Sequence, residues 1–175
     1  FCFFLFSCEK EDFKQDCNQR TIFMYLPWST NLTDYFYNNI SDMEEAIKGK
    51  GVQKERMIVF LSTSSKEAQM FEILLENGTC KRSILKEYQE PAFTTEIGLT
   101  GIINDMKTFA PAQSYSMIIG CHGMGWLPVN DSESRVSQTF KYHWEYKNVP
   151  QTRFFGGLSP EYQTDISTLV KSIAN

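Results

Sequence analysis

One segment of the chain combines a proton-transferring side chain with an accessible backbone. It runs from Tyr115 to Trp126 and reads YSMIIGCHGMGW, so an apolar run ends at a histidine set among glycines. Histidine can accept and return a proton near neutral pH, and glycine neighbours leave backbone N–H groups free of side-chain bulk. His122 and Gly123 are therefore the first candidates for a catalytic site. A buried histidine with a satisfied partner is the alternative that this local pattern leaves open.

The same segment contains residues typical of two other kinds of site. Cys121 could pair with His122 as a nucleophile, but successive residues of a strand point to opposite faces, so we expect Cys121 to be a small buried hydrophobe. The glycines at Gly120, Gly123 and Gly125 could suggest a phosphate-binding loop. Their spacing is not G-x-G-x-x-G and the residues that follow do not open a helix, which argues against that loop.

Three apolar runs predict the strands that position this histidine. They are Thr21–Leu26, Met57–Leu61 and Tyr115–Ile119. Between the first two, apolar residues recur at helical spacing from Phe36 to Ile47, with Gly49 as a stop. A strand, a helix and a strand in succession predict parallel pairing. The third run predicts a buried strand that delivers His122 to the carboxyl edge of the sheet, where ligands bind in open α/β folds.

The remaining patterns complete an α/β fold. Asn-Gly at 77–78 lies between two strand-like runs and predicts a β-hairpin, which we expect to be an appendage. Leu99–Phe109 has helical spacing and predicts a second amphipathic helix. A last helix is predicted from Pro160 to about Ile173, with Ser159 as its N-cap and proline at the first helical position.

The composition restricts the kinds of partner. The chain has 175 residues, a net charge of -4 and 42% hydrophobic residues, which suits one compact domain with no nucleic-acid partner. No apolar stretch reaches the roughly 20 residues of a spanning helix, so the body is expected to be soluble. Five cysteines without a C-x-x-C pair indicate neither a zinc site nor a disulfide framework, and no cofactor is needed. A Cys17–Cys80 bridge stays open.

The first residues have the character of a targeting segment. An apolar run from Phe1 to Phe6 precedes Ser7 and Cys8, and acidic and basic residues follow. This pattern is typical of the end of a secretion signal, and Leu5-Phe6-Ser7-Cys8 resembles a bacterial lipobox. It predicts cleavage before Cys8 and a lipid on its thiol, so that the protein is a cell-envelope lipoprotein or is secreted and meets the membrane only through that lipid. An ordinary signal with an incidental cysteine is the alternative.

The histidine segment also carries a family resemblance. Together with Arg20–Tyr25 and the helix start at Asn31-Leu32, the His-Gly-x-Gly-Trp core resembles the amino-terminal half of the clostripain family of cysteine endopeptidases, over about residues 20–175. The resemblance implies a caspase-like fold, a mostly parallel sheet flanked by helices. Residues 1–19 would then be the signal tail and linker, and residues 20–175 the amino-terminal part of the peptidase domain.

The resemblance also implies roles for single residues. His122 matches the histidine that assists the cysteine thiolate and protonates the leaving amine, and Gly123 matches the residue whose N–H helps to hold the oxyanion. The family's nucleophile follows a strand in a motif like Asp-x-Cys, which this chain does not contain. We therefore expect a fold that is incomplete at the carboxyl end and inactive alone, with the carboxyl-terminal part of the same peptidase as its partner.

Substrate and maturation follow from the same resemblance. Family members cut peptides or proteins after Arg or Lys and cleave themselves between the histidine and the cysteine. The polar segment 129–135 predicts a maturation site at Arg135, with Lys141 and Lys147 as rivals and a solvated loop as the alternative. Calcium is possible by resemblance only, since no acidic ligand pattern supports it. The alternative function is a non-catalytic envelope lipoprotein that uses the same fold for binding.

Overall fold

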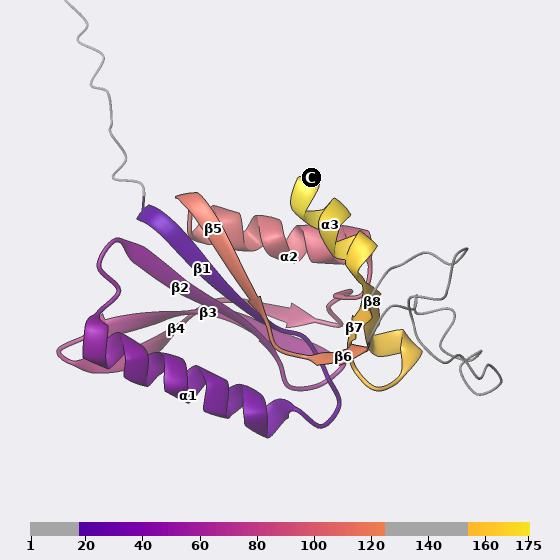
Figure 1. Cartoon of the computed structure of the whole chain (residues 1–175), viewed down its shortest axis with the longest axis horizontal. Helices are drawn as coiled ribbons and strands as arrows, with labels where there is room; N and C mark the ends of the chain where they lie inside the picture. Colours follow the sequence, from indigo (N-terminus) through magenta and orange to yellow (C-terminus); the bar gives the residue numbers. More distant parts are fainter. Residues whose placement is uncertain (1–17, 125–153) are drawn as a thin grey trace, which may run out of the picture.

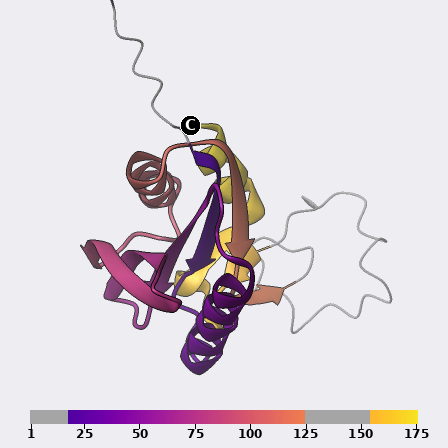
Figure 2. The same cartoon turned by 90° about the vertical axis from the view of Figure 1, so that its left-hand side faces the viewer.

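The computed structural model describes residues 18–124 and 154–175. Within them, five strands form one sheet in the order β4-β3-β2-β1-β5 and three short strands form a second sheet in the order β6-β7-β8. Helix α1 covers one face of the large sheet and helices α2 and α3 cover the other (Figures 1 and 2). The strands of the large sheet are β1 (Asn18–Leu26), β2 (Glu55–Ser62), β3 (Glu67–Glu76), β4 (Thr79–Gln89) and β5 (Ala112–Ile119). The other elements are α1 (Thr33–Lys50), α2 (Glu96–Phe109), α3 (Ile166–Ala174), β6 (His122–Met124), β7 (Phe154–Gly156), β8 (Gln163–Asp165) and the 3-10 turn η3 (Pro160–Tyr162).

The centre of the large sheet is parallel, as the strand–helix–strand order predicts. Strand β1 pairs in parallel with both β2 and β5, so that Phe23 lies between Ile58 and Met117. Strand β1 begins at Asn18, two residues before the predicted start of the domain. The predicted hairpin forms between β3 and β4, with Asn77 and Gly78 at its turn, both at positive φ. It is not an appendage, because β3 pairs antiparallel with β2 and extends the main sheet.

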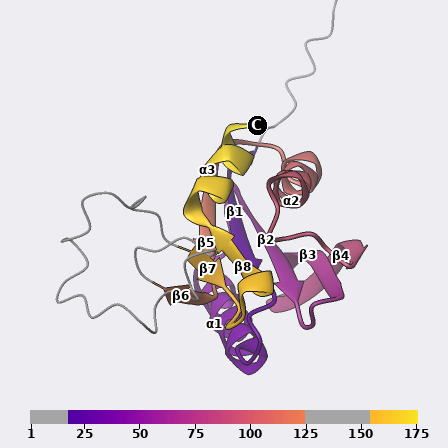
Figure 3. The same cartoon turned by 90° about the vertical axis from the view of Figure 1, so that its right-hand side faces the viewer.

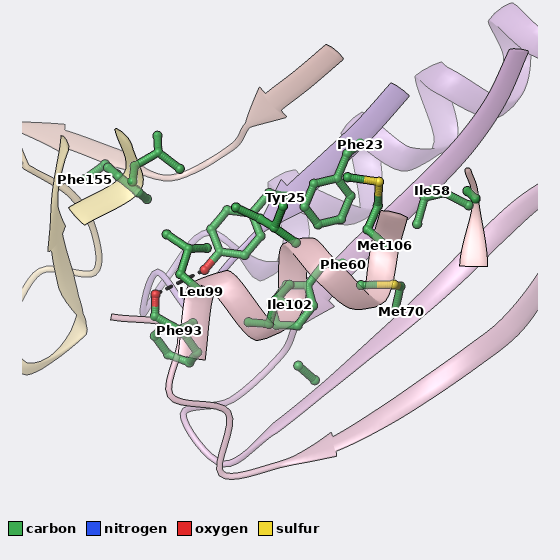
Figure 4. Close-up of a cluster of buried hydrophobic side chains, with 14 residues drawn as sticks. Phe23, Tyr25, Ile58, Phe60, Met70, Phe93, Leu99, Ile102, Met106 and Phe155 are labelled. Atoms are coloured by element: carbon green, nitrogen blue, oxygen red, sulfur yellow. Dashed lines mark hydrogen bonds between the residues drawn. The ribbon is translucent and has the colours of Figure 1, made fainter. Parts of the chain in front are cut away.

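Both faces of the central strands β1 and β2 are buried, and each face has its own core. Alternate residues of a strand point to opposite faces, so Phe23 and Tyr25 pack on the α2 side while Met24 and Leu26 pack on the α1 side. Figure 4 shows the α2-side cluster, where the Tyr25 hydroxyl donates to the carbonyl oxygen of Phe93 at 3.3 Å. Burial raises the pKa of Tyr25 above its ordinary value.

Helices α1 and α2 follow the predicted spacing. Helix α1 buries Phe36, Ile40 and Ile47 and ends at Gly51, whose φ is 75°, two residues beyond the predicted stop. Helix α2 begins after Thr95, whose hydroxyl accepts the N–H of Gly98 at 3.1 Å as an N-cap. Among the described residues, no helix is long and apolar enough to cross a membrane.

Two predicted elements differ from the structure. Strand β5 is not a buried strand: it is an edge of the described sheet, and Tyr115 and Ile118 are 41% and 43% exposed. The last helix does not begin at Pro160. Residues 163–165 form β8 instead, since they pair with β7 and bury Gln163 and Thr164, and α3 begins only at Ile166.

Candidate active site

The chain turns sharply between β5 and His122. Strand β5 ends at Ile119, and the Gly120 N–H still donates to the carbonyl oxygen of Tyr25 at 3.0 Å, so the contact with β1 continues one residue further. A Cβ at Gly120 would lie 2.5 Å from the Leu26 side chain and 3.5 Å from the Phe36 ring. Glycine therefore lets the backbone pass close to the helix-covered face before His122 begins β6.

The small sheet holds His122 from the other side. His122 is opposite Gly156 in the antiparallel β6–β7 pair, and β7 pairs in turn with β8 (Figure 3). Gly156 has a φ of 129°, and a Cβ there would lie 2.1 Å from the carbonyl oxygen of Tyr162. The same oxygen accepts the N–H of Gly157 at 2.8 Å. Glycine at 156 thus lets β7 pass close to Tyr162 while it pairs with the His122 strand, and no local sequence pattern indicates this requirement.

The imidazole of His122 has one described hydrogen-bond partner. Its Nε2 atom lies 2.7 Å from Oδ1 of Asn31, a residue 91 positions earlier in the chain. Asn31 lies in the loop between β1 and α1, so the carboxyl ends of β1 and β5 bring the two side chains together. In the sequence, Asn31 stands out only as part of a helix start. The contact is long-range, and no local spacing could have signalled it.

Gly123 lies next to His122 in β6, opposite Phe155. It is exposed, and a Cβ placed on it would have no described heavy atom within 4 Å. As far as the described residues go, the space beside the backbone of Gly123 is open, which suits an approaching ligand. A role in holding an oxyanion remains a prediction.

The two cysteines in the described residues are poorly suited to act as the nucleophile. Burial raises the pKa of the Cys121 thiol, and a hydrogen bond from the Gly156 backbone opposes that rise only in part. A raised pKa keeps the thiol protonated and unreactive. Cys121 packs against the α2-side core, as expected of a small hydrophobe, and the Cys80 thiol donates to the carbonyl oxygen of Glu44 on α1 at 3.3 Å.

Several predicted residues lie outside the described ranges. They are Cys8, Cys17, Arg135, Lys141 and Lys147. Residues 18–124 and 154–175 contain no group of His, Cys, Asp or Glu side chains that could hold a metal ion. Of the predicted site residues, His122 and Gly123 are thus the two that the structure describes.

Comparison with known proteins identifies the fold. A secreted C11 cysteine protease from Bacteroides thetaiotaomicron, "iotapain", is 49% identical over 91% of this chain, with a TM-score of 0.78. A clostripain from the same organism, in complex with the peptide inhibitor BTN-VLTK-AOMK, is also 49% identical; it covers 65% of this chain and 97% of its own, with a TM-score of 0.63. An inactive zymogen C11 protease from Parabacteroides distasonis is 28% identical over 66% of this chain, with a TM-score of 0.59.

These similarities confirm the predicted caspase-like fold, a sheet flanked by helices; the large sheet is mixed, with a parallel centre and the antiparallel strands β3 and β4. The chain spans 43% of the length of iotapain and 33% of the length of the zymogen. No protein-family profile and no curated protein sequence matches the chain.

Proposed function

This chain belongs to the clostripain family of cysteine peptidases, and we propose that it forms the histidine-bearing part of an endopeptidase that cleaves after arginine or lysine. The observation that carries the proposal is the placement of His122. It follows the strand next to β1, its ring is held at Nε2 by Asn31, and an exposed glycine stands beside it. The 49% identity to cysteine proteases, together with this placement of His122, supports the same chemistry.

In the proposed reaction, His122 moves the protons. It takes the proton of a cysteine thiol, and the thiolate attacks the carbonyl carbon of the scissile peptide bond. The Gly123 N–H donates to the oxyanion that forms on the carbonyl oxygen, and His122 then gives its proton to the leaving amine. Water, deprotonated by His122, hydrolyses the resulting thioester and returns the thiol.

The thiol would come from the carboxyl-terminal part of the same peptidase. The chain spans 43% of the length of iotapain, so a large part of that relative has no counterpart here. The edge of the described sheet at β5 supports this partner, because Ile118 is half exposed there and an open hollow of about 400 Å³ lies between β5 and α1. Most of the hollow is lined by apolar side chains, among them Leu26, Met43 and Ile119. We expect this chain alone to be inactive.

The proposed preference for basic residues rests on a relative. The clostripain that is 49% identical to this chain is in complex with an inhibitor whose peptide, VLTK, ends in lysine. The acidic groups that would select a basic side chain are expected near the nucleophile. Matched peptides that end in Arg, Lys, Gln or Leu would measure the preference, and equal rates on all four would exclude it.

The test of the catalytic role compares two histidine variants of the full-length protein. His122→Ala should lower kcat/KM on Arg and Lys peptides by about 100-fold or more, since general acid–base catalysis contributes about 10²–10⁴-fold. His143→Ala, at the only other histidine of the chain, is the matched control and should keep its activity. Equal rates for wild type and His122→Ala would exclude the proposed role. A full-length protein without any activity would favour the binding lipoprotein instead.

Maturation by self-cleavage at Arg135 is part of the proposal. One relative in the family is an inactive zymogen, which supports an activation step. Amino-terminal sequencing of the active protein should find a new terminus at Val136, and Arg135→Ala should block it. Cleavage at Lys141 or Lys147 would move the site, and an unbroken active chain would exclude it.

Export is the last element of the proposal. A relative that is 49% identical is a secreted protease, which supports a secretion signal before the domain. Lipid attachment at Cys8 would keep the exported protein at the cell envelope. Fatty-acid labelling that disappears in Cys8→Ala would support the anchor, whereas a freely soluble, unlabelled wild-type protein would exclude it.

A further inference from the structure

The loop between β1 and α1 brings one side chain to the ring of His122. Asn31 Oδ1 lies 2.7 Å from His122 Nε2. We propose that Asn31 is a positioning residue that fixes His122 as the Nε2–H tautomer, so that Nδ1 is the atom that exchanges protons with the thiol and the leaving amine. This inference rests on the proposed function, because it assigns atoms within that reaction.

The assignment follows from the chemistry of the two groups. An amide oxygen can only accept a hydrogen bond, so Nε2 must carry the hydrogen when it faces Oδ1. A neutral imidazole carries one N–H, and its other nitrogen then presents a lone pair. With Nε2 engaged, Nδ1 is left as the proton acceptor. In the reaction, Nδ1 takes the thiol proton and later transfers it to the amine nitrogen, while the Nε2–H bond to Asn31 is kept throughout.

The backbone that aims Asn31 is strained. Thr30 has a φ of 63°, which is uncommon for a β-branched residue. The Asn31 N–H donates to the carbonyl oxygen of Ser29 at 2.8 Å, so Thr30 is the centre of a three-residue γ-turn with a left-handed middle residue, a rare and strained form. Strain of this kind persists where the surrounding structure imposes it, and it occurs preferentially at functional sites.

The surrounding structure does impose this turn. Ser29 is buried, and its hydroxyl donates to the carbonyl oxygen of Pro27 at 3.0 Å. On the other side, Oγ1 of Thr30 accepts the N–H of Leu158 at 3.3 Å. Leu158 follows β7, the strand that pairs with the His122 strand. One segment therefore braces both the histidine and the turn that carries Asn31, which fixes the geometry between the two side chains.

The first test reads the tautomer directly. Ring ¹⁵N chemical shifts of the full-length protein, measured at about pH 8.5, above the ordinary titration range of imidazole, distinguish Nε2–H from Nδ1–H. The His122→Ala variant assigns the signals by removing them. We expect the Nε2–H pattern in wild type and in Asn31→Asp, whose carboxylate also accepts, and a mixture of tautomers in Asn31→Ala. Asn38→Ala, an exposed asparagine of α1, is the matched control and should match wild type.

The second test reads the rate. Loss of a single hydrogen bond that orients the ring should lower kcat of Asn31→Ala by about 10-fold, with KM little changed. Asn31→Asp should keep more of kcat than Asn31→Ala, and thermal unfolding of each variant should stay near wild type. A folded Asn31→Ala with unchanged kcat would overturn the proposal. So would an Nδ1–H pattern in wild type.

The two readouts separate this proposal from the proposed function. The tautomer is measured without any substrate, so it can be read in a protein that shows no peptidase activity. If His122→Ala is as active as wild type, the proposed function fails whatever the tautomer is. If His122→Ala is inactive while Asn31→Ala shows the wild-type tautomer pattern, the role of Asn31 fails and the peptidase assignment stands.

Discussion

Gly156 offers a direct test of how the small sheet holds His122. Its φ of 129° is a conformation that residues with a Cβ rarely adopt, and a Cβ there would lie 2.1 Å from the carbonyl oxygen of Tyr162. That oxygen is not free to move, because it also accepts the Gly157 N–H at 2.8 Å. We expect Gly156→Ala to cost about 1–3 kcal/mol for the backbone conformation and about as much again for the overlap.

A loss of this size is large compared with the roughly 5–15 kcal/mol that stabilises a typical domain. The first part to yield should be the short β6–β7 pair, in which Gly156 is opposite His122. Movement of that pair would displace the imidazole from Asn31. The substitution should therefore reduce the free energy of unfolding and, in the full-length protein, the proposed peptidase activity as well.

Urea unfolding followed by circular dichroism measures the free energy of unfolding, and hydrogen exchange of the amides at 122–124 measures the local opening of β6. Gly101→Ala is the matched control, since Gly101 lies in α2 with no described atom within 4 Å of an added Cβ. Alanine there should stabilise the helix by about 0.5–1 kcal/mol. If Gly156→Ala unfolds within about 0.5 kcal/mol of wild type and keeps its exchange protection, the reasoning about this strand is refuted.

Three further predictions concern the core. Glu72 and Arg56 form a partly buried ion pair bonded at 2.7 and 2.5 Å, so Glu72→Gln should lower the free energy of urea unfolding by about 1–3 kcal/mol. Glu55→Gln, which removes the charge from the more exposed pair with Arg20, should lower it by less than about 1 kcal/mol, and equal losses would contradict this. Folding raises the pKa of Tyr25, so as the pH rises the unfolded state loses the phenol proton first. The free energy of unfolding should be unaffected below about pH 10 and should fall above it by up to about 1.4 kcal/mol per pH unit, and Tyr25→Phe should flatten that slope. Because burial raises its pKa, Cys121 should react slowly with iodoacetamide at about pH 8.5 until urea unfolds the protein; reaction of the folded protein at the rate of a free thiol would contradict this.

The sequence could predict the elements whose signal is local. The apolar runs of β1 and β2 and the helical spacing of α1 and α2 all formed as predicted, because each pattern repeats along its own segment. The Asn-Gly turn also formed, since a two-residue turn needs only those two residue types. Elements of this kind are specified by residues that lie close together in the sequence.

The errors arose where a distant segment decides the structure. Residues 163–165 have helical neighbours, yet they pair with β7 and bury Gln163 and Thr164. The β3–β4 hairpin was expected to stand apart, but β3 adds to the sheet at β2. In each case the competing interaction is a strand pairing, and local spacing carries no information about which strand will be the partner.

The residues of the candidate site also differ in whether a local pattern in the sequence reveals them. His122 and Gly123 could be found because a histidine among glycines after an apolar run is a local signal. Asn31 could not, since it reaches the imidazole only through the parallel pairing of β1 with β5. The glycine requirement at Gly156 depends on the carbonyl oxygen of Tyr162, and that contact exists only once β7 and β8 have paired.

The parallel pairing also restricts where the proposed nucleophile can lie. Strands β1 and β5 run in the same direction, so their carboxyl ends meet at one edge, and this is why Asn31 and His122 are neighbours. A further strand that paired in parallel with β5, at the edge of the described sheet, would end beside His122. A cysteine at its carboxyl end would then face Nδ1, the ring nitrogen that Asn31 leaves free. An antiparallel strand would begin, not end, at this edge. A nucleophile found on such a strand would contradict the arrangement proposed for this site.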